Sequence, residues 1–581
     1  MEESVFDIPL LLDEISQYLS ESDLRNCICV SRIWSARFIP ILWRTVDFSS
    51  RNLKYNLNTF RKGQTHVRTI KFGSSWFSEV ISGAHGHKHP FHFHFPSLRS
   101  LHWRFSYHCL QEPESFGLAL DFFKAHPTLR DISFNLDIIA PGLVAALDKS
   151  NLPALRSLYL FGGNDIKGDT SVQQLIHACA RLEFLYIIIE RYKSHSEGPN
   201  TDLYQERKAI MENMPTTRLR CLTIELCCPS QEAVTLVPLL RKSPLLQELR
   251  IHFSPGNDMS RSIATILRDE GCCPELRTLS IMQDKITDSE LAELINACTS
   301  HTSLSGNHRS SLITTTSNKV HRNLKDLTIA SRNFGPLTIK SLAQNFAQSL
   351  VALNIAECEY VCLSKVTALV SSLPGLQKLI VGRIYFVSEV RGGTNSLVNA
   401  LETPWVCRGL EFLSFDLFWS NAMDYGDEDD SDMESYGNTD YGSTGEADTN
   451  DMTDLADFRS RCLSCFWDRV GELENLRYLS YDGEEFPLVT STENNVTYLD
   501  QLRGLKKMQT LEIYFYSTIS VKQAEWLMLY WPNLSHIMGL KRRHNKDCSC
   551  SQQERMNHEC PLEQCKGMAV LKTARPWIII D

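Results

Sequence analysis

The stretch Leu246-Gln247-Glu248-Leu249-Arg250-Ile251 decides the fold of this 581-residue chain, because variants of it recur along most of the sequence. Each copy places two apolar residues three positions apart, and a third apolar residue follows two positions later. The spacing of two between Leu249 and Ile251 is that of a strand with one buried face. The copies occupy residues 95–101, 129–134, 152–160, 181–185, 219–224, 246–251, 276–281, 324–329, 350–355, 376–381, 410–415, 476–479, 508–513 and 534–537.

The distance between copies identifies the class of repeat. The first leucine of one copy lies 27 residues after the preceding one between Leu155 and Leu182, and 26 residues after it between Leu324 and Leu350. Both distances fall within the window of roughly 20–29 residues that is typical of leucine-rich repeats. Larger gaps, from residue 276 to 324 and from 410 to 476, indicate insertions or a degenerate copy.

Helix start signals lie between the strand copies. Thr287 precedes Glu290 by three residues, and Ser520 precedes Gln523 in the same way, which are the spacings of capping boxes. One strand and one helix per repeat predict an α/β fold, an irregular leucine-rich-repeat solenoid. We expect a horseshoe with a parallel sheet inside and helices outside, in which the repeated leucines form the core.

A different pattern precedes the repeats. Ser20 and Asp23 resemble a helix start, and Pro9 suits the first turn of a helix, where its missing N–H removes no bond. Apolar residues recur at helical spacing on two faces, Leu11, Leu12, Ile15 and Leu19 on one, and Leu24, Cys27, Ile28 and Val30 on the other. The pattern predicts about three short helices, a unit too small to hold a large core by itself and better suited to docking than to catalysis.

This N-terminal segment resembles the F-box. The residues that carry the resemblance are Pro9, Ile15, Tyr18, Leu19, Asp23, Leu24, Val30, Trp34 and Trp43. The segment departs from the motif at Leu10, where an acidic residue often follows the proline, and at Ser16, where a large apolar residue is common. The resemblance implies docking on a Skp-family adaptor, and through it on cullin and RING subunits. The residues assigned to adaptor docking, or to the small core beneath it, are Pro9, Leu12, Ile15, Leu19, Leu24, Val30 and Trp34.

An F-box followed by leucine-rich repeats resembles the F-box/leucine-rich-repeat substrate receptors of ubiquitin ligases, and the irregular repeats look like the large fungal sets of such proteins. The resemblance implies a non-catalytic subunit of an SCF-type E3 ubiquitin ligase whose repeats bind a target protein. Because side chains alternate along a strand, residues flanking the second leucine should face the concave side. These are Glu248, Arg250, Thr278, Ser280, Asp326, Thr328, Tyr478 and Ser480. The alternative is a non-ligase scaffold in which the helical segment caps the solenoid.

The sequence predicts four parts: an F-box domain at 1–48, a linker at 49–65, the solenoid at 66–540 and a cysteine-containing tail at 541–581. Residues 424–457 carry 13 acidic side chains and no Lys or Arg, which predicts a disordered insert in the solenoid. Binding of a basic partner, or phosphorylation at Ser431 or Ser435, is the alternative role. Removing these 13 charges from the net charge of −10 leaves +3 for the rest, so no basic nucleic-acid footprint is evident.

Several function classes find little support in the sequence. It contains no N-terminal signal and no apolar run near 18 residues, so we expect neither secretion nor a membrane span, and a cytoplasmic or nuclear location. The 19 cysteines are scattered, which favours reduced thiols over a disulfide framework. Phosphate-loop, nucleophile-elbow and zinc-protease motifs are absent, so we expect no enzyme and no cofactor.

Two clusters of metal-ligand residue types remain. The tail contains Cys548, Cys550, His558, Cys560 and Cys565, but Cys-x-Cys is not the Cys-x₂-Cys pair of most structural zinc sites. We therefore expect free thiols there, with zinc as the alternative. The histidines between His85 and His94 could share one face of a strand, but an exposed loop is the favoured interpretation.

Overall fold

A computed structural model of the chain describes residues 9–16, 18–48, 62–73, 94–104, 121–136, 147, 151–162, 171–178, 180–189, 201–226, 229–253, 259–269, 272–283, 286–298, 324–385, 401–418, 449–482, 497–513, 519–539 and 566–580. The chain forms two compact units. Unit 1 comprises residues 1–276 and 300–319, and unit 2 comprises residues 277–299 and 320–581.

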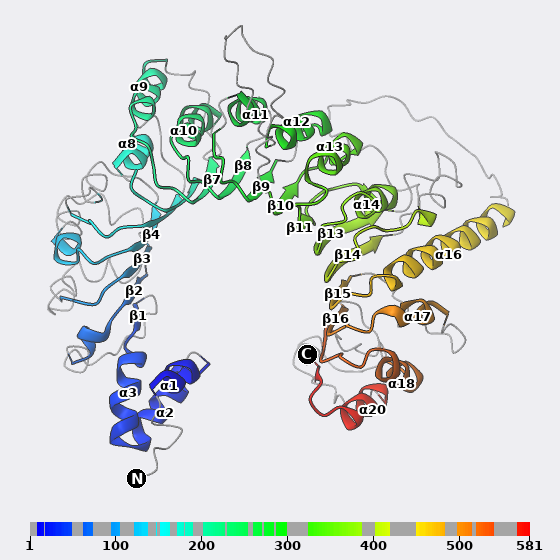
Figure 1. The fold of residues 1–581 in the computed structure, drawn as a ribbon. Helices are drawn as coiled ribbons and strands as arrows, with labels where there is room; N and C mark the ends of the chain where they lie inside the picture. Colours follow the sequence, from blue (N-terminus) through cyan, green and yellow to red (C-terminus); the bar gives the residue numbers. More distant parts are fainter. Residues whose placement is uncertain are drawn as a thin grey trace, which may run out of the picture. The chain divides into compact units, whose positions relative to one another are not determined.

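Unit 1 begins with three short helices, α1 (Pro9–Ser16), α2 (Glu21–Val30) and α3 (Arg32–Leu42), which Figure 1 shows next to one another. The predicted capping box at the start of α2 is confirmed. The Asp23 N–H donates to the Ser20 hydroxyl at 3.2 Å, and the Ser20 N–H donates to the Asp23 carboxylate at 3.1 Å. Ser31 caps α3 in turn by accepting the Trp34 N–H at 3.1 Å. These caps satisfy backbone donors that helix starts leave unpaired.

The repeats of unit 1 form a ladder of parallel strands in chain order, each pairing with the next. The strands are β1 (Thr45–Phe48), β2 (Thr69–Phe72), β3 (Ser100–Arg104), β4 (Asp131–Leu136), β5 (Ser157–Gly162), β6 (Phe184–Ile189), β7 (Cys221–Leu226) and β8 (Glu248–Phe253). The 3₁₀ helix η2 (Gln64–His66) precedes β2.

Unit 2 contains a second ladder, also parallel, in which β12 pairs with β13 beside the main series. The strands are β9 (Thr278–Met282), β10 (Asp326–Ala330), β11 (Ala352–Ile355), β12 (Val361–Cys362), β13 (Lys378–Tyr385), β14 (Phe412–Phe418), β15 (Tyr478–Tyr481), β16 (Thr510–Ile513), β17 (His536–Met538) and β18 (Ile579–Ile580). Every one of the fourteen predicted copies overlaps one of the described strands.

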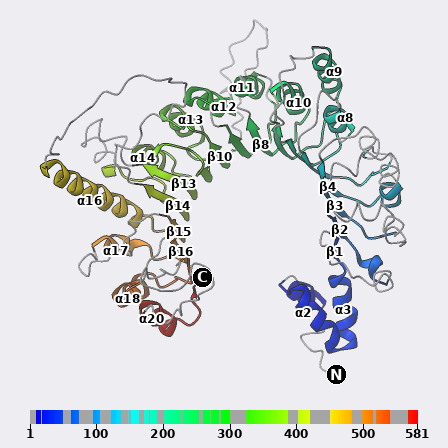
Figure 2. The same cartoon turned by 180° about the vertical axis from the view of Figure 1, so that it is seen from behind.

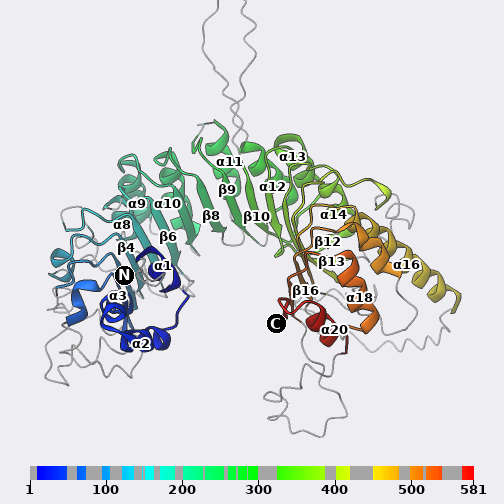
Figure 3. The same cartoon turned by 60° about the horizontal axis from the view of Figure 1, so that its bottom comes forward.

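Helices lie along one side of each ladder, and we call the opposite side the open strand face (Figures 1 and 2). Figure 3 shows the strands side by side in both units. The helices of unit 1 are α8 (Ser171–Ala178), α9 (Thr201–Glu212), α10 (Pro229–Arg241) and α11 (Met259–Asp269). Those of unit 2 are α12 (Asp288–Ala297), α13 (Pro336–Phe346), α14 (Leu363–Val370), α16 (Thr449–Gly471), α17 (Thr497–Gln501), α18 (Val521–Tyr530), α20 (Lys566–Ala574) and the 3₁₀ helix η6 (Leu502–Gly504).

The repeated apolar positions form continuous buried columns. Leu222 pairs in register with Leu249, and Ile224 with Ile251, and all four side chains are buried. In the first repeats the second column is aromatic. Phe48 and Phe72 lie 5.4 Å apart between ring centroids, and Phe72 and Trp103 lie 5.6 Å apart. Each repeat thus buries its apolar side chains against the next one, as the sequence predicts.

One carboxylate joins two neighbouring repeats of unit 2. Asp288, in the first turn of α12, accepts the backbone N–H of Gly335 at 3.1 Å, of Leu337 at 2.9 Å and of Thr338 at 2.9 Å. It therefore caps α13, whose own N-cap residue, Gly335, has no side chain to do so. A Cβ on Gly335 would lie 2.5 Å from an Asp288 oxygen, so the close approach requires glycine. The helix α12 that carries Asp288 is also the helix for which the sequence predicts a capping box. The capping box of Thr287 and Glu290 is confirmed.

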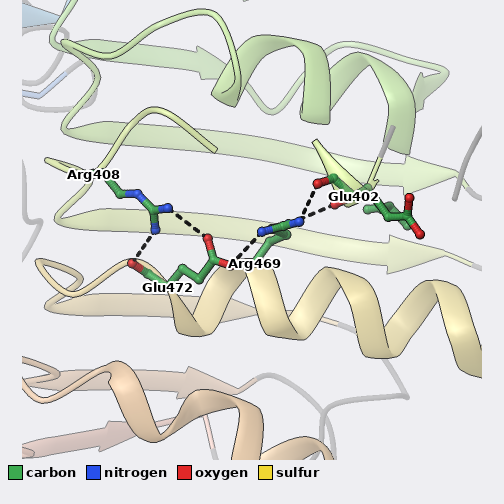
Figure 4. A network of polar contacts seen from close by, with 5 residues as sticks. Glu402, Arg408, Arg469 and Glu472 are labelled. Atoms are coloured by element: carbon green, nitrogen blue, oxygen red, sulfur yellow. Dashed lines mark hydrogen bonds and ion pairs between the residues drawn. The ribbon is translucent and has the colours of Figure 1, made fainter. Parts of the chain in front are cut away.

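A second network joins the repeats of β14 and β15 (Figure 4). The Arg469 guanidinium on α16 donates to the Leu401 carbonyl at 3.0 Å, to the Glu402 carbonyl and to the Glu472 carboxylate at 2.6 Å. Glu472 also pairs with Arg408 at 3.0 Å. Because Arg469 supplies donors to carbonyls of the preceding repeat, it fixes α16 against that repeat.

The strand ladder is longer than the sequence analysis predicts at both ends. β1 lies within residues 1–48, which were assigned to the helical domain, although the three helices end at Leu42. At the other end, α20 and β18 lie within the predicted tail, and β18 pairs with β17 through His536 and Ile579. Both strands lack the full leucine pattern, so periodicity alone did not identify them.

The last residues of the acidic segment 424–457 are helical. Helix α16 begins at Thr449, inside the segment that the composition predicts as disordered. The helix continues into a buried apolar stretch that includes Phe458, Cys462 and Trp467. Packing of this stretch supplies the stability that an isolated acidic helix would lack. Residues 424–448, with Ser431 and Ser435, lie outside the described residues.

We expect Asp288→Ala to lower the free energy of unfolding of the repeat array by about 1–2 kcal/mol, because three N–H groups of α13 lose their acceptor. Asp288→Asn keeps one side-chain oxygen and should lose less. The urea midpoint, followed by circular dichroism, measures the change. Glu474→Ala, at an exposed position of the same unit, is the control, and an equal loss in both variants would contradict the capping role.

The imidazole of His126 is buried among residues that precede β3 and β4, in a fixed neutral form. Its Nε2 accepts the Phe95 N–H at 2.9 Å, so Nδ1 carries the proton and donates to the Phe122 carbonyl at 2.7 Å. Burial is the main reason that the pKa of His126 falls from 6.5 to about 4. Protonation would place a charge in an apolar site and remove the acceptor for Phe95.

This histidine predicts acid sensitivity. The His126 side chain binds a proton near pH 6.5 in the unfolded chain and only near pH 4 in the folded chain. The contribution of neutral His126 to the free energy of unfolding is therefore complete above pH 6.5 and falls as the pH drops toward 4. The full loss of unfolding free energy is about 3 kcal/mol. Urea midpoints at about pH 7 and about pH 4.5 measure the trend, and His126→Gln should flatten it. An unchanged pH slope in that variant would rule out His126 as the cause.

Candidate interaction surfaces

The three N-terminal helices enclose a small core. Leu12, Leu24 and Phe38 are buried, and Leu19, Cys27, Ile28, Trp34, Ile41 and Leu42 pack against them partly exposed. The rings of Trp34 and Phe38 lie 5.5 Å apart between centroids. Of the predicted docking residues, Leu12 and Leu24 therefore belong to the core, and Leu19 and Trp34 border it.

Other apolar side chains of these helices face outward. Tyr18 is 81 % exposed, Val30 is 65 % exposed and Ile33 is 58 % exposed. Val30 ends α2 and Ile33 lies in the first turn of α3, so the two flank the same turn at Ser31. The F-box resemblance indicates Val30 but not Ile33, which the three-residue spacing from Val30 could have indicated. Contiguous exposed apolar side chains mark interaction sites, so the turn that carries Val30 and Ile33 is a candidate docking surface.

The remaining predicted positions of this unit are less exposed. Ile15 is half-buried on α1, and Ser16 is 9 % exposed, although the motif more often has a large apolar residue there. Pro9 and Leu10 form the start of α1, but their side chains lie outside what the structure describes. The small Ser16 side chain is thus one of the inward-facing residues of α1.

On the open strand face of unit 1, four aromatic side chains gather on β5 and β6. They are Tyr159, Phe161, Phe184 and Tyr186, of which Tyr159 is 37 % exposed and Phe184 is 39 % exposed. Tyr186 lies 6.0 Å from Tyr159 and 5.2 Å from Phe161 between ring centroids. Burial and then the nearby Asp131 raise the pKa of Tyr159, and burial and then Glu225 raise that of Tyr186, so both phenols stay neutral. We call these four residues the aromatic cluster.

The predicted target-binding residues Glu248 and Arg250 lie two strands from this cluster. Arg250 Nε donates to the Glu248 carboxylate at 2.6 Å, so the two charges neutralise each other. On the neighbouring strand, Glu225 lies 2.9 Å from the imidazole of His252. The open face of unit 1 therefore combines an apolar centre with paired charges at its β8 end. The sequence analysis found the charges but missed the aromatic cluster.

In unit 2, Tyr478 lies within a set of stacked side chains. Its ring stacks on Phe412 at 4.1 Å with an interplanar angle of 7°, and the Lys378 ammonium lies 4.8 Å from the Phe412 ring. The Tyr478 hydroxyl donates to the Glu512 carboxylate. The sequence placed Tyr478 on the open face, where the structure has it half-buried among these partners.

The two serines predicted to face a target are almost fully buried. Ser280 and Ser480 are each 5 % exposed. A serine side chain is short, and neighbours such as Glu512 beside Ser480 extend beyond it. Thr278, Asp326 and Thr328 remain accessible or half-buried, and the Thr278 hydroxyl donates to Asp326 at 3.4 Å. Serine at this position marks the correct strand face, but it contributes little surface.

Further along the open face of unit 2 lies a charged pair that the sequence analysis did not single out. Arg383 Nε lies 3.8 Å from the Asp416 carboxylate, and the guanidinium lies 5.9 Å from the ring of Phe418. Burial and then the Asp482 charge raise the pKa of Asp416 to about 6, against the opposing effect of Arg383. Tyr385 lies 5.6 Å from Phe418 between centroids, which extends the apolar surface.

The described residues contain no group of three or more His, Cys, Asp or Glu arranged to hold a metal ion. The tail candidates Cys548, Cys550, His558, Cys560 and Cys565 lie outside the described residues, as do the histidines at 85–92. Burial raises the pKa of Cys358 and Cys407 to about 12, so these thiols stay protonated and unreactive. None of the described helices is both long and apolar enough to cross a membrane.

Leucine columns, parallel strand ladders and one helix-covered side define a leucine-rich-repeat fold of the protein-interaction class. No family model and no curated protein matches the sequence. A solved chain of the Rad7 and Elc1 complex in yeast is 12 % identical with a TM-score of 0.32, and the alignment covers 94 % of this chain and 90 % of that one.

Two further solved structures are similar at the same level. The leucine-rich-repeat-containing protein LegL7 from Legionella pneumophila is 12 % identical with a TM-score of 0.29, covering 64 % of this chain and 97 % of that one. The TLR13–ssRNA13 complex is 12 % identical with a TM-score of 0.32, covering 85 % of this chain but only 61 % of that one. The class assignment therefore rests on the strand register and the burial pattern of this chain.

The split between core and surface in the helical unit can be tested by substitution. Leu24→Ala should destabilise α2 and α3 by about 2–5 kcal/mol, because it leaves a cavity in a three-residue core. Val30→Ser should change their stability by no more than about 0.5 kcal/mol, because the side chain is exposed. Hydrogen exchange of the α2 and α3 amides measures both changes. Equally fast exchange in the two variants would show that Val30 is part of the core.

Proposed function

We propose that this protein is the target-binding subunit of an SCF-type E3 ubiquitin ligase, acting in the cytoplasm or nucleus. The observation that carries the proposal is the helical unit, in which Leu12, Leu24 and Phe38 close a core while Val30 and Ile33 remain exposed. The F-box resemblance of the same residues supports docking of this surface on a Skp-family adaptor. Cullin and RING subunits would then join through the adaptor.

The proposed role requires no bond chemistry from this chain. The helical unit would hold the ligase and the open strand faces would hold a target, which raises the effective concentration of target lysines near the charged ubiquitin-carrying enzyme. The aromatic cluster suits target binding, because tyrosine is enriched among the residues that carry most of the binding energy at interfaces, and aromatic residues including phenylalanine are enriched at interface cores. The receptor is thus proposed as non-catalytic and free of cofactors.

A second candidate is a non-ligase scaffold whose helices cap the repeats. One observation favours it: α3 leads directly into β1, and the Arg44 carbonyl that follows α3 accepts the N–H groups of Arg68 and Thr69 at 2.9 and 3.0 Å. Deleting residues 1–42 while keeping β1 separates the roles. A cap's removal would lower the melting temperature of the repeats, whereas a docking unit's removal would leave it nearly unchanged.

Adaptor capture tests the leading proposal. Val30→Asp combined with Ile33→Asp should abolish co-purification of a Skp-family adaptor, because each places a charge in an apolar interface. Hydrogen exchange should show the helices still folded, since both positions are exposed. Leu245→Asp combined with Leu529→Asp, at positions 47 % and 70 % exposed, is the matched control and should leave capture intact.

Two results would count against the proposal, the first against the receptor role and the second against the docking surface. One is failure of the folded, unsubstituted protein to capture the adaptor. The other is capture that survives in the Val30 and Ile33 double variant, which would exclude this surface as the docking site.

A further inference from the structure

Five arginines stand in one row along the edge of the unit 1 ladder. Arg44, Arg68, Arg99, Arg130 and Arg156 each immediately precede the first residue of β1, β2, β3, β4 and β5. Their backbones are paired in sequence: the N–H of Arg99 donates to the Arg68 carbonyl at 2.8 Å, and that of Arg130 to the Arg99 carbonyl at 2.7 Å. We call these five residues the arginine row.

The row is a concentrated positive charge. Neighbouring strands are about 4.8 Å apart, so the five side chains leave the backbone over a length of about 19 Å. All five side chains are exposed. Within the described part of the chain, the ion pair recorded for the row is that of Arg156 with Glu183, at 3.5 Å. Of the five residues that directly follow the arginines, only Asp131 is acidic.

The fold itself does not require arginine at these positions. In unit 2 the equivalent edge positions are Arg277, Lys325, Val351, Gln377, Glu411, Arg477, Gln509 and Ser535. There, charges of opposite sign compensate each other, since Arg477 lies 3.8 Å from Glu411. Apolar, neutral and acidic residues thus build the same edge equally well. Like charges on adjacent strands repel, so the uniform row in unit 1 carries a cost that its repeats could have avoided.

We propose that the arginine row binds an acidic segment of a partner polypeptide. An extended chain rises about 3.3 Å per residue, so about six residues would cover the row, with carboxylates or phosphates facing the guanidinium groups. Arginine suits both anions, because its planar fork donates two parallel hydrogen bonds to either. The row shares no residue with the aromatic cluster or with α1–α3, and its proposed role goes beyond adaptor docking.

A nucleic acid fits the row less well than a polypeptide. Single-stranded nucleic acids are bound by basic grooves whose aromatic side chains stack on the bases. Of the ten residues that stand next to the five arginines in the sequence, only Trp43 is aromatic.

Fluorescence anisotropy with the full chain tests the proposal. The probes are a labelled oligoglutamate peptide, a peptide of equal length with phosphoserines, an oligoglutamine peptide and an oligouridine of similar length. The protein should bind one or both anionic peptides, with a Kd that rises with salt, and should not bind the glutamine peptide. The two anionic arms show whether carboxylate or phosphate is the preferred group.

Matched triple variants locate the site. Arg68→Gln, Arg99→Gln and Arg130→Gln together should raise the Kd about tenfold, the loss expected for three exposed charge pairs. Arg277→Gln, Lys325→Gln and Arg477→Gln together remove the same charge from the edge of unit 2 and should leave the Kd unchanged. An equal rise in both triple variants, no binding of either anionic peptide, or tighter binding of the oligouridine would overturn the proposal. Adaptor capture is independent of these outcomes, because the row lies outside α1–α3.

Discussion

Parallel register is the constraint on which both units depend. Because each strand pairs with the next at equivalent positions, a buried leucine such as Leu249 lies beside the equivalent buried apolar residue of the neighbouring repeat, here Leu222. No repeat could bury these side chains alone, so the stability of each one is shared with its neighbours. The same register also aligns the surface residues, and an aromatic cluster on two adjacent strands or a row of arginines on five follows directly from it.

The polar contacts between repeats complement this apolar stacking. Asp288 caps a helix of the next repeat, and Arg469 donates to carbonyls of the preceding one. Each contact satisfies helix-end groups that would otherwise be unpaired in a partly buried site. The helical unit is stabilised differently. Its core contains only three buried residues, and side chains such as Val30 remain exposed. A core this small thus leaves apolar side chains exposed on the surface of the helices.

Much of this architecture was predictable from periodicity, but the surfaces were less so. The leucine pattern located fourteen strands, whereas β1 and β2 were missed because Trp43 and Val67 stand where the first leucine is expected. Alternation assigned Ser480 to the correct face but could not show that its neighbours cover it. The aromatic cluster depends on which residues of separate strands become neighbours. Predicting it requires the register between those strands, which the pattern within one repeat does not give. The helical caps were found because their signal spans only three residues.

The hydrogen bonds from α13 to Asp288 affect where the sequence can tolerate insertions. The sequence between the end of α12 and the start of β10, from residue 298 to 326, joins two elements whose positions are already fixed. Hydrogen bonds to β9 hold β10, and the Asp288 carboxylate holds α13 against α12. Lengthening a connection between fixed ends costs only a slowly growing loop entropy. Insertions can therefore accumulate between these repeats during evolution without displacing the repeats themselves.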